Sequence, residues 1–429
     1  MAAGTPAWMG WLALGALVLA FAAIAWWLFL SPLPNRIRPA GTTVRARRAR
    51  RLVATLMLVS AASFLTGARW DEIWHRKYGG FGDDFLWPPH LMLYASLGLN
   101  AIFAALGLGL ALRGAGSLRE RFRQEPVMGF LGLMATYQMA SIPSDLLWHE
   151  IIGPDITAWS LPHALLALTT TAVLLAGVAI ALSARAGPGG LQPDEARTPG
   201  DGAASSLHRA SYGPHSWRRL PCVQPMEQVA LALTALSLLA LLQIGTTEWE
   251  WSRPGEVARA VLQRPAWAYP VVVLLVGVAH ASLALHATHL TGAATAVTAG
   301  ALGAQMVAIG AARLALPPGP ALASHALLLP PALALDAWHA WWLRRQGRIT
   351  VATAWMGAPL YTAVYVLVAF PYIAAFLPAP RLDAASRLAT VAIGLPAALV
   401  VSGAGAYVGR WLRAIGSPAP AHLHRLEER

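Results

Sequence analysis

Cysteine and charge are the two features that this 429-residue sequence has least of. Its single cysteine, Cys222, excludes an internal disulfide framework and any metal site built only from thiolates. Charged residues make up 12% of the chain, half of the roughly 25% found in soluble domains, which excludes a soluble enzyme. Hydrophobic residues make up 56%, which excludes a disordered chain because disorder requires low hydrophobicity and high charge.

Long apolar runs take the place of the missing charge, and the mean hydropathy is +0.51. A run of about 20 apolar residues can cross the roughly 30 Å core of a bilayer as a helix. The sequence therefore predicts an all-α integral membrane protein with about eleven transmembrane helices. The predicted spans are 8–30, 51–68, 87–113, 126–147, 161–183, 225–246, 267–289, 291–316, 320–342, 350–377 and 385–411. The first span is too long for a cleavable signal peptide, so we expect it to remain as a helix.

The net charge of +12 reflects arginines that cluster between the spans. They follow the first, third, fifth and ninth spans and close the chain, which places the N-terminus outside and the C-terminus in the cytoplasm. The opposite loops carry the acidic residues Asp71, Glu72, Asp83, Asp84, Glu150, Asp155, Glu248 and Glu250. This pattern indicates a multi-pass protein of a bacterial-type inner membrane. It accounts for the basic balance without nucleic acid, which we do not expect as a partner.

A Gly/Pro/Ser/Arg-rich stretch over residues 184–223 interrupts the hydrophobic pattern. It cannot bury a core, so we expect a flexible cytoplasmic linker. The predicted organisation is a five-helix membrane bundle over residues 1–183, this linker, a six-helix membrane bundle over residues 224–412, and a cytoplasmic tail over residues 413–429. The small-residue composition of the second bundle suits close helix packing.

One polar pattern occurs twice in the first bundle. In each copy an Asp precedes a His by four residues, a short loop follows, and a second His comes directly after a proline. Residues four apart share a helix face, and proline suits the first turn of a helix. Each copy thus brings one carboxylate and two imidazoles together, a set suited to a metal ion. The predicted metal ligands are Asp71, His75 and His90 in the first copy and Asp145, His149 and His163 in the second.

Other polar residues beside the two copies could support these ligands through hydrogen bonds. The candidates are Glu72, Asp84, Glu150, Asp155 and Tyr94. An alternative interpretation makes the motif residues helix caps and members of an aromatic belt at the membrane surface. Four tryptophans in and beside the motifs suit that belt: Trp74, Trp87, Trp148 and Trp159.

The two motifs resemble those of the C-type subunit of the copper membrane monooxygenases, the family of the particulate methane and ammonia monooxygenases. Segment Asp71–Tyr94 is similar to a family motif in which an Asp-x3-His is followed about a dozen residues later by a Pro-x-His. Segment Asp145–His163 is similar to an Asn-x3-His followed thirteen residues later by a His, the same gap as between His149 and His163. The resemblance covers roughly residues 50–185. This sequence departs from it in a longer first gap, with fourteen residues between the histidines, and in Asp145 replacing the family's Asn.

The resemblance implies two neighbouring copper sites, one formed by each copy of the motif. It also implies oxidation of a small apolar substrate by dioxygen near the outer face, with quinol or another reductant as the electron source. Other monooxygenase-type subunits, or further copies of this chain, would be partners besides the lipid bilayer. The ligand chemistry alone leaves iron and zinc open, since a carboxylate and two imidazoles suit either metal.

Two alternatives from other functional classes remain. A copper-handling or assembly protein would bind the metal and pass it on without turnover, although Cu(I) carriers usually present methionine clusters that this chain lacks. A structural subunit of a membrane complex would use the same residues only to brace helices.

A second group of polar residues lies toward the cytoplasmic end of the second bundle. The pairs His286/His289 and Asp336/His339 each share a helix face because their members are three residues apart. They predict a second metal or haem site or a proton path on the inner side, formed by His280, His286, His289, Asp336 and His339. The alternative is an inner membrane boundary marked by the neighbouring Trp and Arg residues.

Overall fold

A computed structural model describes residues 7–30, 44–78, 86–151, 161–185, 218–219, 223–250, 265–315, 324–376 and 381–416. These residues are almost entirely helical, as predicted. The N-terminal elements are α1 (Ala7–Ala25), the π-helical turn η1 (Trp26–Leu30), α2 (Val44–Tyr78), α3 (Pro88–Ala111), α4 (Leu118–Gln124), α5 (Pro126–Ile151) and α6 (Leu161–Ser183). They are followed by α7 (Pro225–Glu250), α9 (Ala268–Thr288), α10 (Ala293–Ala315), α11 (Ser324–Leu327), α12 (Leu329–Gln346), α13 (Val351–Phe376) and α14 (Ala384–Gly416).

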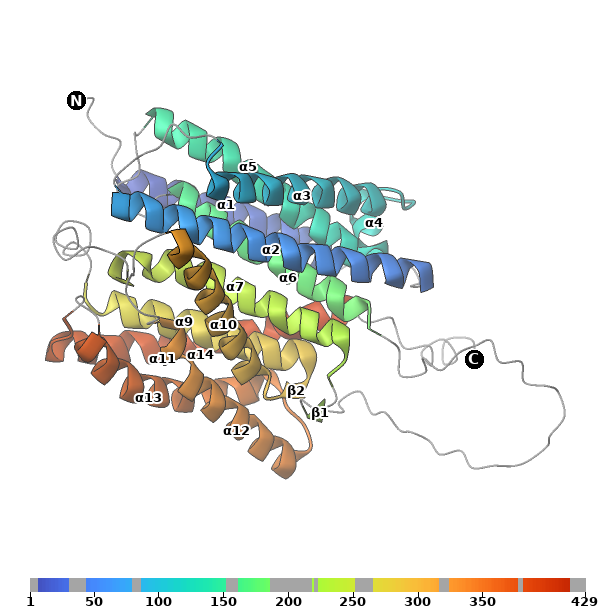
Figure 1. Ribbon diagram of the computed structural model, residues 1–429. Coiled ribbons are helices and arrows are strands. Elements are labelled where there is room, and N and C mark those ends of the chain that lie inside the picture. The colour runs from blue at the N-terminus through green and yellow to red at the C-terminus, as the bar shows by residue number, and fades with distance from the viewer. Residues whose placement is uncertain are drawn as a thin grey trace, which may run out of the picture.

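The long helices lie roughly alongside one another, with α1 to α6 in one half of the molecule and α7 to α14 in the other (Figure 1). Each predicted span overlaps one of these helices. Eight helices within the described residues are long and apolar enough to cross a membrane. The helix α12 is not among them because it has 18 residues, three of which are charged. The count of eleven spans and the orientation stay predictions.

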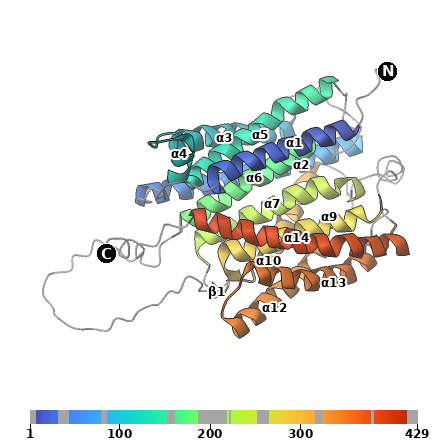
Figure 2. The ribbon, with the colours of Figure 1, turned by 180° about the vertical axis from the view of Figure 1, so that it is seen from behind.

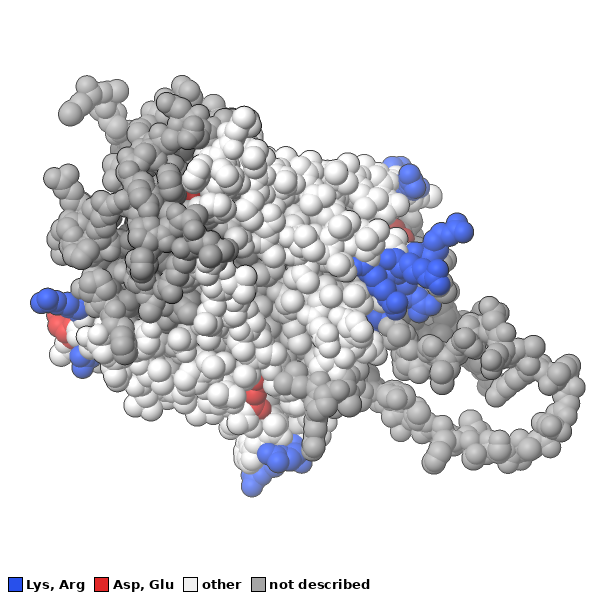
Figure 3. Space-filling model, in the orientation of Figure 1, with Lys and Arg blue, Asp and Glu red and all other residues white. Residues whose placement is uncertain are grey.

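Basic side chains gather at one end of the bundle, where α2 begins and α4 lies (Figure 3). The middle of this face is almost entirely uncharged (Figure 3). We call this the basic end of the bundle, and the end where α2 stops and α3 and α6 begin the opposite end. An uncharged belt between polar ends is what a bilayer requires of the surface that it covers.

The two predicted bundles pack against each other along α6 and α7. One apolar core draws buried residues from both, including Leu174 of α6, Leu233 of α7 and Leu412 of α14. A buried polar contact joins them as well: with its carboxamide oxygen facing the guanidinium, Gln305 of α10 accepts hydrogen bonds from Arg69 of α2 at 3.1 and 2.6 Å. Seen from behind, α14 runs beside α9 (Figure 2).

Aromatic side chains from three distant parts of the chain meet near the basic end. The ring of Phe29 in η1 lies 5.8 Å from that of Phe130 in α5 and 6.0 Å from that of Trp411 in α14. Phe130 and Trp411 are 4.9 Å apart, edge to face. Such edge-to-face pairs add stability beyond the area that they bury, so this cluster fastens the first and last helices to α5.

Two short strands are present within the described residues. The strand β1 (Arg218–Arg219) pairs in parallel with β2 (Leu290–Thr291), which lies in the turn between α9 and α10. That turn is tight because His289 adopts a left-handed conformation with φ 56° and Gly292 has φ 93°. The predicted linker thus contributes two residues to a strand pair, while its residues 186–217 and 220–222 lie outside the described part.

Candidate functional site

The helix starts predicted from the two motifs are confirmed. The helix α3 begins at Pro88 with proline in its first two positions, so His90 lies in its first turn. The helix α6 begins at Leu161 and places His163 likewise in its first turn. Proline is accommodated there because the first N–H groups of a helix have no partner within it. Both histidines therefore lie at the opposite end of the bundle.

Asp71 and His90 of the first motif are in direct contact. The Nε2 atom of His90 lies 3.0 Å from Oδ1 of Asp71, and the side chains are 19% and 22% exposed, respectively. One turn further along α3, the ring of Tyr94 lies 6.1 Å from the His90 ring, centroid to centroid. Among the predicted supporting residues, Tyr94 is the one whose side chain is described, and it lies beside the ligand candidate His90.

The two motifs meet at a cavity of about 120 Å³, which we call the large cavity. Asp71 lines it from the first motif and His163 from the second. The other polar lining groups are Thr170 of α6 and Gln243 of α7. The remaining wall is apolar and consists of Phe64, Leu65, Ala68, Leu93, Leu166, Ala167, Ala240 and Ile244. An apolar pocket with a few convergent polar groups is the usual form of a small-molecule site.

The other predicted ligands lie on helices that end at this same end of the bundle. His75 belongs to the last turn of α2, and Asp145 and His149 to the end of α5, but their side chains lie outside the described residues. The same holds for the side chains of Glu72 and Glu150, and for Asp84 and Asp155 altogether. Among the residues that the structure describes, no three His, Cys, Asp or Glu side chains converge closely enough to hold a metal ion.

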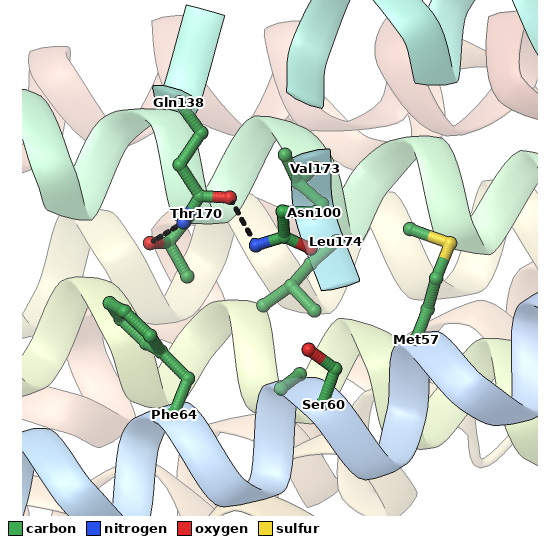
Figure 4. A pocket seen from close by; sticks show the side chains of 9 residues that line it. Met57, Ser60, Phe64, Asn100, Gln138, Thr170, Val173 and Leu174 are labelled. Carbon is green, nitrogen blue, oxygen red and sulfur yellow. Dashed lines mark hydrogen bonds between the residues drawn. The ribbon is translucent and has the colours of Figure 1, made fainter. Parts of the chain in front are cut away.

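A second, smaller cavity adjoins the first and was not anticipated from the sequence. It has a volume of about 10 Å³ and is lined by Met57, Ser60, Ala61, Phe64, Asn100, Gln138, Thr170, Val173 and Leu174 (Figure 4). The Asn100 amide donates to Gln138 Oε1 at 2.7 Å, and the Gln138 amide donates to Thr170 Oγ1 at 2.9 Å. A single polar residue in an apolar run carries no repeated spacing, so the only signal for this small cavity was the polarity of Asn100 and Gln138 themselves.

Several of the five residues of the predicted inner site contact groups outside that site. Asp336 accepts hydrogen bonds from the backbone N–H groups of Gly292 and Thr295 at 3.0 and 2.8 Å, and so caps α10. His280 contacts Ser237 Oγ at 3.0 Å, and His289 ends α9. Two of the four imidazoles do come near each other, since the rings of His286 and His339 are 6.0 Å apart.

No family model, curated protein or solved structure matches the chain.

Proposed function

We propose that the chain is a membrane metalloprotein whose two motifs bind copper at the mouth of the large cavity and oxidise a small apolar substrate with dioxygen. The observation that carries this proposal is the meeting of Asp71 and His163 at one cavity, although 92 positions separate them. Belt and cap residues have no reason to converge on a shared cavity, whereas ligands of two neighbouring metal sites must lie close together. The copper and the reaction rest on the family resemblance of the motifs.

The donor set present fits a divalent metal ion. One carboxylate and two imidazoles leave positions open for an exogenous ligand. Asp71, His75 and His90 would hold one ion, and Asp145, His149 and His163 a neighbouring one. When bound, copper would activate dioxygen, with electrons from a quinol or another reductant.

The chain's own residues would prepare the site in three ways. The Asp71 carboxylate contacts Nε2 of His90 at 3.0 Å and so holds these two proposed ligands side by side. Leu93, Leu166 and Ile244 exclude water from the space in which an apolar substrate would lie. Gln243 brings a group from the second bundle to the wall, so both halves of the molecule would be required.

Elemental analysis of the full chain in nanodiscs tests this proposal. Wild type should retain stoichiometric copper, and His90→Ala and His163→Ala should lose it. His208→Ala is the matched control, because this histidine belongs to the predicted linker, and it should keep the metal. Absence of any metal after reconstitution would refute the proposal, while zinc or iron at the same stoichiometry would refute copper and retain the site. Dioxygen consumption that requires both a quinol and a small apolar substrate then separates a monooxygenase from a copper-handling protein.

A further inference from the structure

Three neutral polar side chains form a hydrogen-bonded chain in the interior of the first half. Asn100, Gln138 and Thr170 lie near the middle of α3, α5 and α6, where a bilayer offers no water to pair with them. Polar groups at that depth are costly and are retained where they serve a function. Asn100 is 7% exposed and Gln138 is 1% exposed, so neither reaches the surface.

The chain of hydrogen bonds leaves one acceptor open. Asn100 donates through its amide, but its carboxamide oxygen accepts no hydrogen bond within the described part of the chain. The side chain lines the small cavity (Figure 4). A space of about 10 Å³ has room for one water-sized group, since a water occupies ~10–15 Å³ by this measure. The small cavity therefore offers an acceptor and space for one donor.

The small and large cavities share two walls, Phe64 and Thr170. Phe64 projects from α2 into the space beside Thr170 and Gln138 (Figure 4). The large cavity, at about 120 Å³, is somewhat smaller than the ~150 Å³ apolar cavity that holds benzene in an engineered protein. Together the two spaces suit a short molecule with an apolar body and one polar end.

The lining groups decide the chemistry of that polar end. In the small cavity Ser60, Asn100, Gln138 and Thr170 are all neutral, so a charged group at that end of the ligand would be buried without a counter-ion beside it, at a large cost. A purely apolar ligand would leave the Asn100 oxygen unpaired, and sites built to bind a hydroxyl reject analogues that lack it. We propose that the two adjoining cavities together bind a short primary alcohol, with its hydroxyl donating to Asn100 and its alkyl chain in the large cavity between Leu166 and Ile244. Binding of the alcohol needs no metal ion, but its alkyl chain lies in the same cavity as the substrate of the proposed oxidation.

Saturation-transfer NMR with 1-propanol on the full chain in nanodiscs tests the proposal, with empty nanodiscs correcting for alcohol in the lipid. The dissociation constant should rise about tenfold in Asn100→Leu, which corresponds to one lost hydrogen bond. It should remain unchanged in Thr136→Val, which removes a hydroxyl from α5 that bonds only to Gly132 O. Equal binding by Asn100→Leu and wild type would overturn the proposal, as would binding indistinguishable from empty nanodiscs.

A second measurement keeps the proposal testable should Asn100→Leu fail to fold. Cys222→Ser removes the only native thiol, so Thr170→Cys in that background carries a single reporter at the wall between the cavities. A small methanethiosulfonate reagent should label it, and 1-propanol should slow the labelling severalfold. No labelling, or labelling that the alcohol does not slow, would overturn the proposal. Metal content measured on the same samples reports separately on the copper centre.

Discussion

Nη1 of Arg185 lies 3.2 Å from Oε1 of Glu227, a carboxylate with no exposed surface. Arg185 follows the end of α6, and Glu227 lies in the first turn of α7, where its Oε2 also accepts from the backbone N–H of Gln224 at 3.1 Å. The pair therefore joins the two halves of the molecule at the basic end. It also holds together the two places where the predicted linker leaves and re-enters the helical bundle.

Removal of the Arg185 charge should destabilise this junction. Arg185→Met removes the positive charge beside the buried Glu227 carboxylate, and breaking a buried ion pair in this way costs about 3–5 kcal/mol. We expect a lowered unfolding midpoint in detergent, followed by tryptophan fluorescence. Arg344→Met removes the same charge from an exposed position of α12 and should shift stability by less than about 0.5 kcal/mol. Equal midpoints for the two variants would show that the pair contributes little.

Two glycines of the same helix should respond oppositely to the same substitution. A Cβ on Gly107 of α3 would lie 2.5 Å from the backbone nitrogen of Gly132 in α5, so Gly107→Ala should push the helices apart at a cost of about 1–3 kcal/mol. Gly98→Ala meets no atom within 4 Å and should be neutral or slightly stabilising, because alanine favours helix. Thermal unfolding of both variants measures the two changes in stability. Similar losses of stability in both would argue against close packing of α3 on α5.

Asp336 should prove structural rather than metal-binding. Besides the backbone N–H groups, it accepts from Thr295 Oγ1 at 2.6 Å, so Asp336→Ala leaves the start of α10 uncapped and should cost about 2 kcal/mol or more. Thr295→Val removes only the hydroxyl and should cost about 1 kcal/mol. Copper content should not change in either variant. A folded Asp336→Ala protein that has lost metal would place this carboxylate in a metal centre.

The contact between Asp71 and His90 yields a prediction that depends on the proposed copper site. Asp71→Asn keeps the shape of the side chain but removes the negative charge that Asp71 would present to the copper ion and to His90, so copper affinity should fall about tenfold to a hundredfold. Competition with a chelator measures this change. Asp383→Asn, the same substitution in front of α14, should leave the affinity unaltered. Comparable losses in both would indicate a general effect of net charge at that end of the bundle.

The sequence was sufficient to place the helices, because each apolar run is long and its ends carry proline or arginine. The family resemblance of the two motifs also implied neighbouring sites, and the structure places Asp71 and His163 in the wall of one cavity. Phe64, Thr170 and Gln243 could not be anticipated as partners in that region. Their presence there depends on how α2, α6 and α7 rotate about their axes and which helices become neighbours, and uniformly apolar runs do not encode either.

The predicted inner site likewise shows what residue spacing can predict and what it cannot. The spacing of three residues correctly placed Asp336 and His339 one turn apart on α12. Spacing could not predict that the Asp336 carboxylate contacts the start of α10 and not a histidine. This contact depends on the turn between α9 and α10. That turn depends on the left-handed backbone at His289 and Gly292, and it directs three N–H groups toward Asp336.

The aromatic cluster of Phe29, Phe130 and Trp411 has a consequence for biosynthesis. The ribosome delivers helices in order, so Phe29 and Phe130 are synthesised long before Trp411. The turn η1 and the helix α5 therefore lack the Trp411 ring between them until α14 has been synthesised. Completion of the bundle is a late event, and a chain shortened before α14 would leave the place of that ring open to lipid or to a quality-control protease.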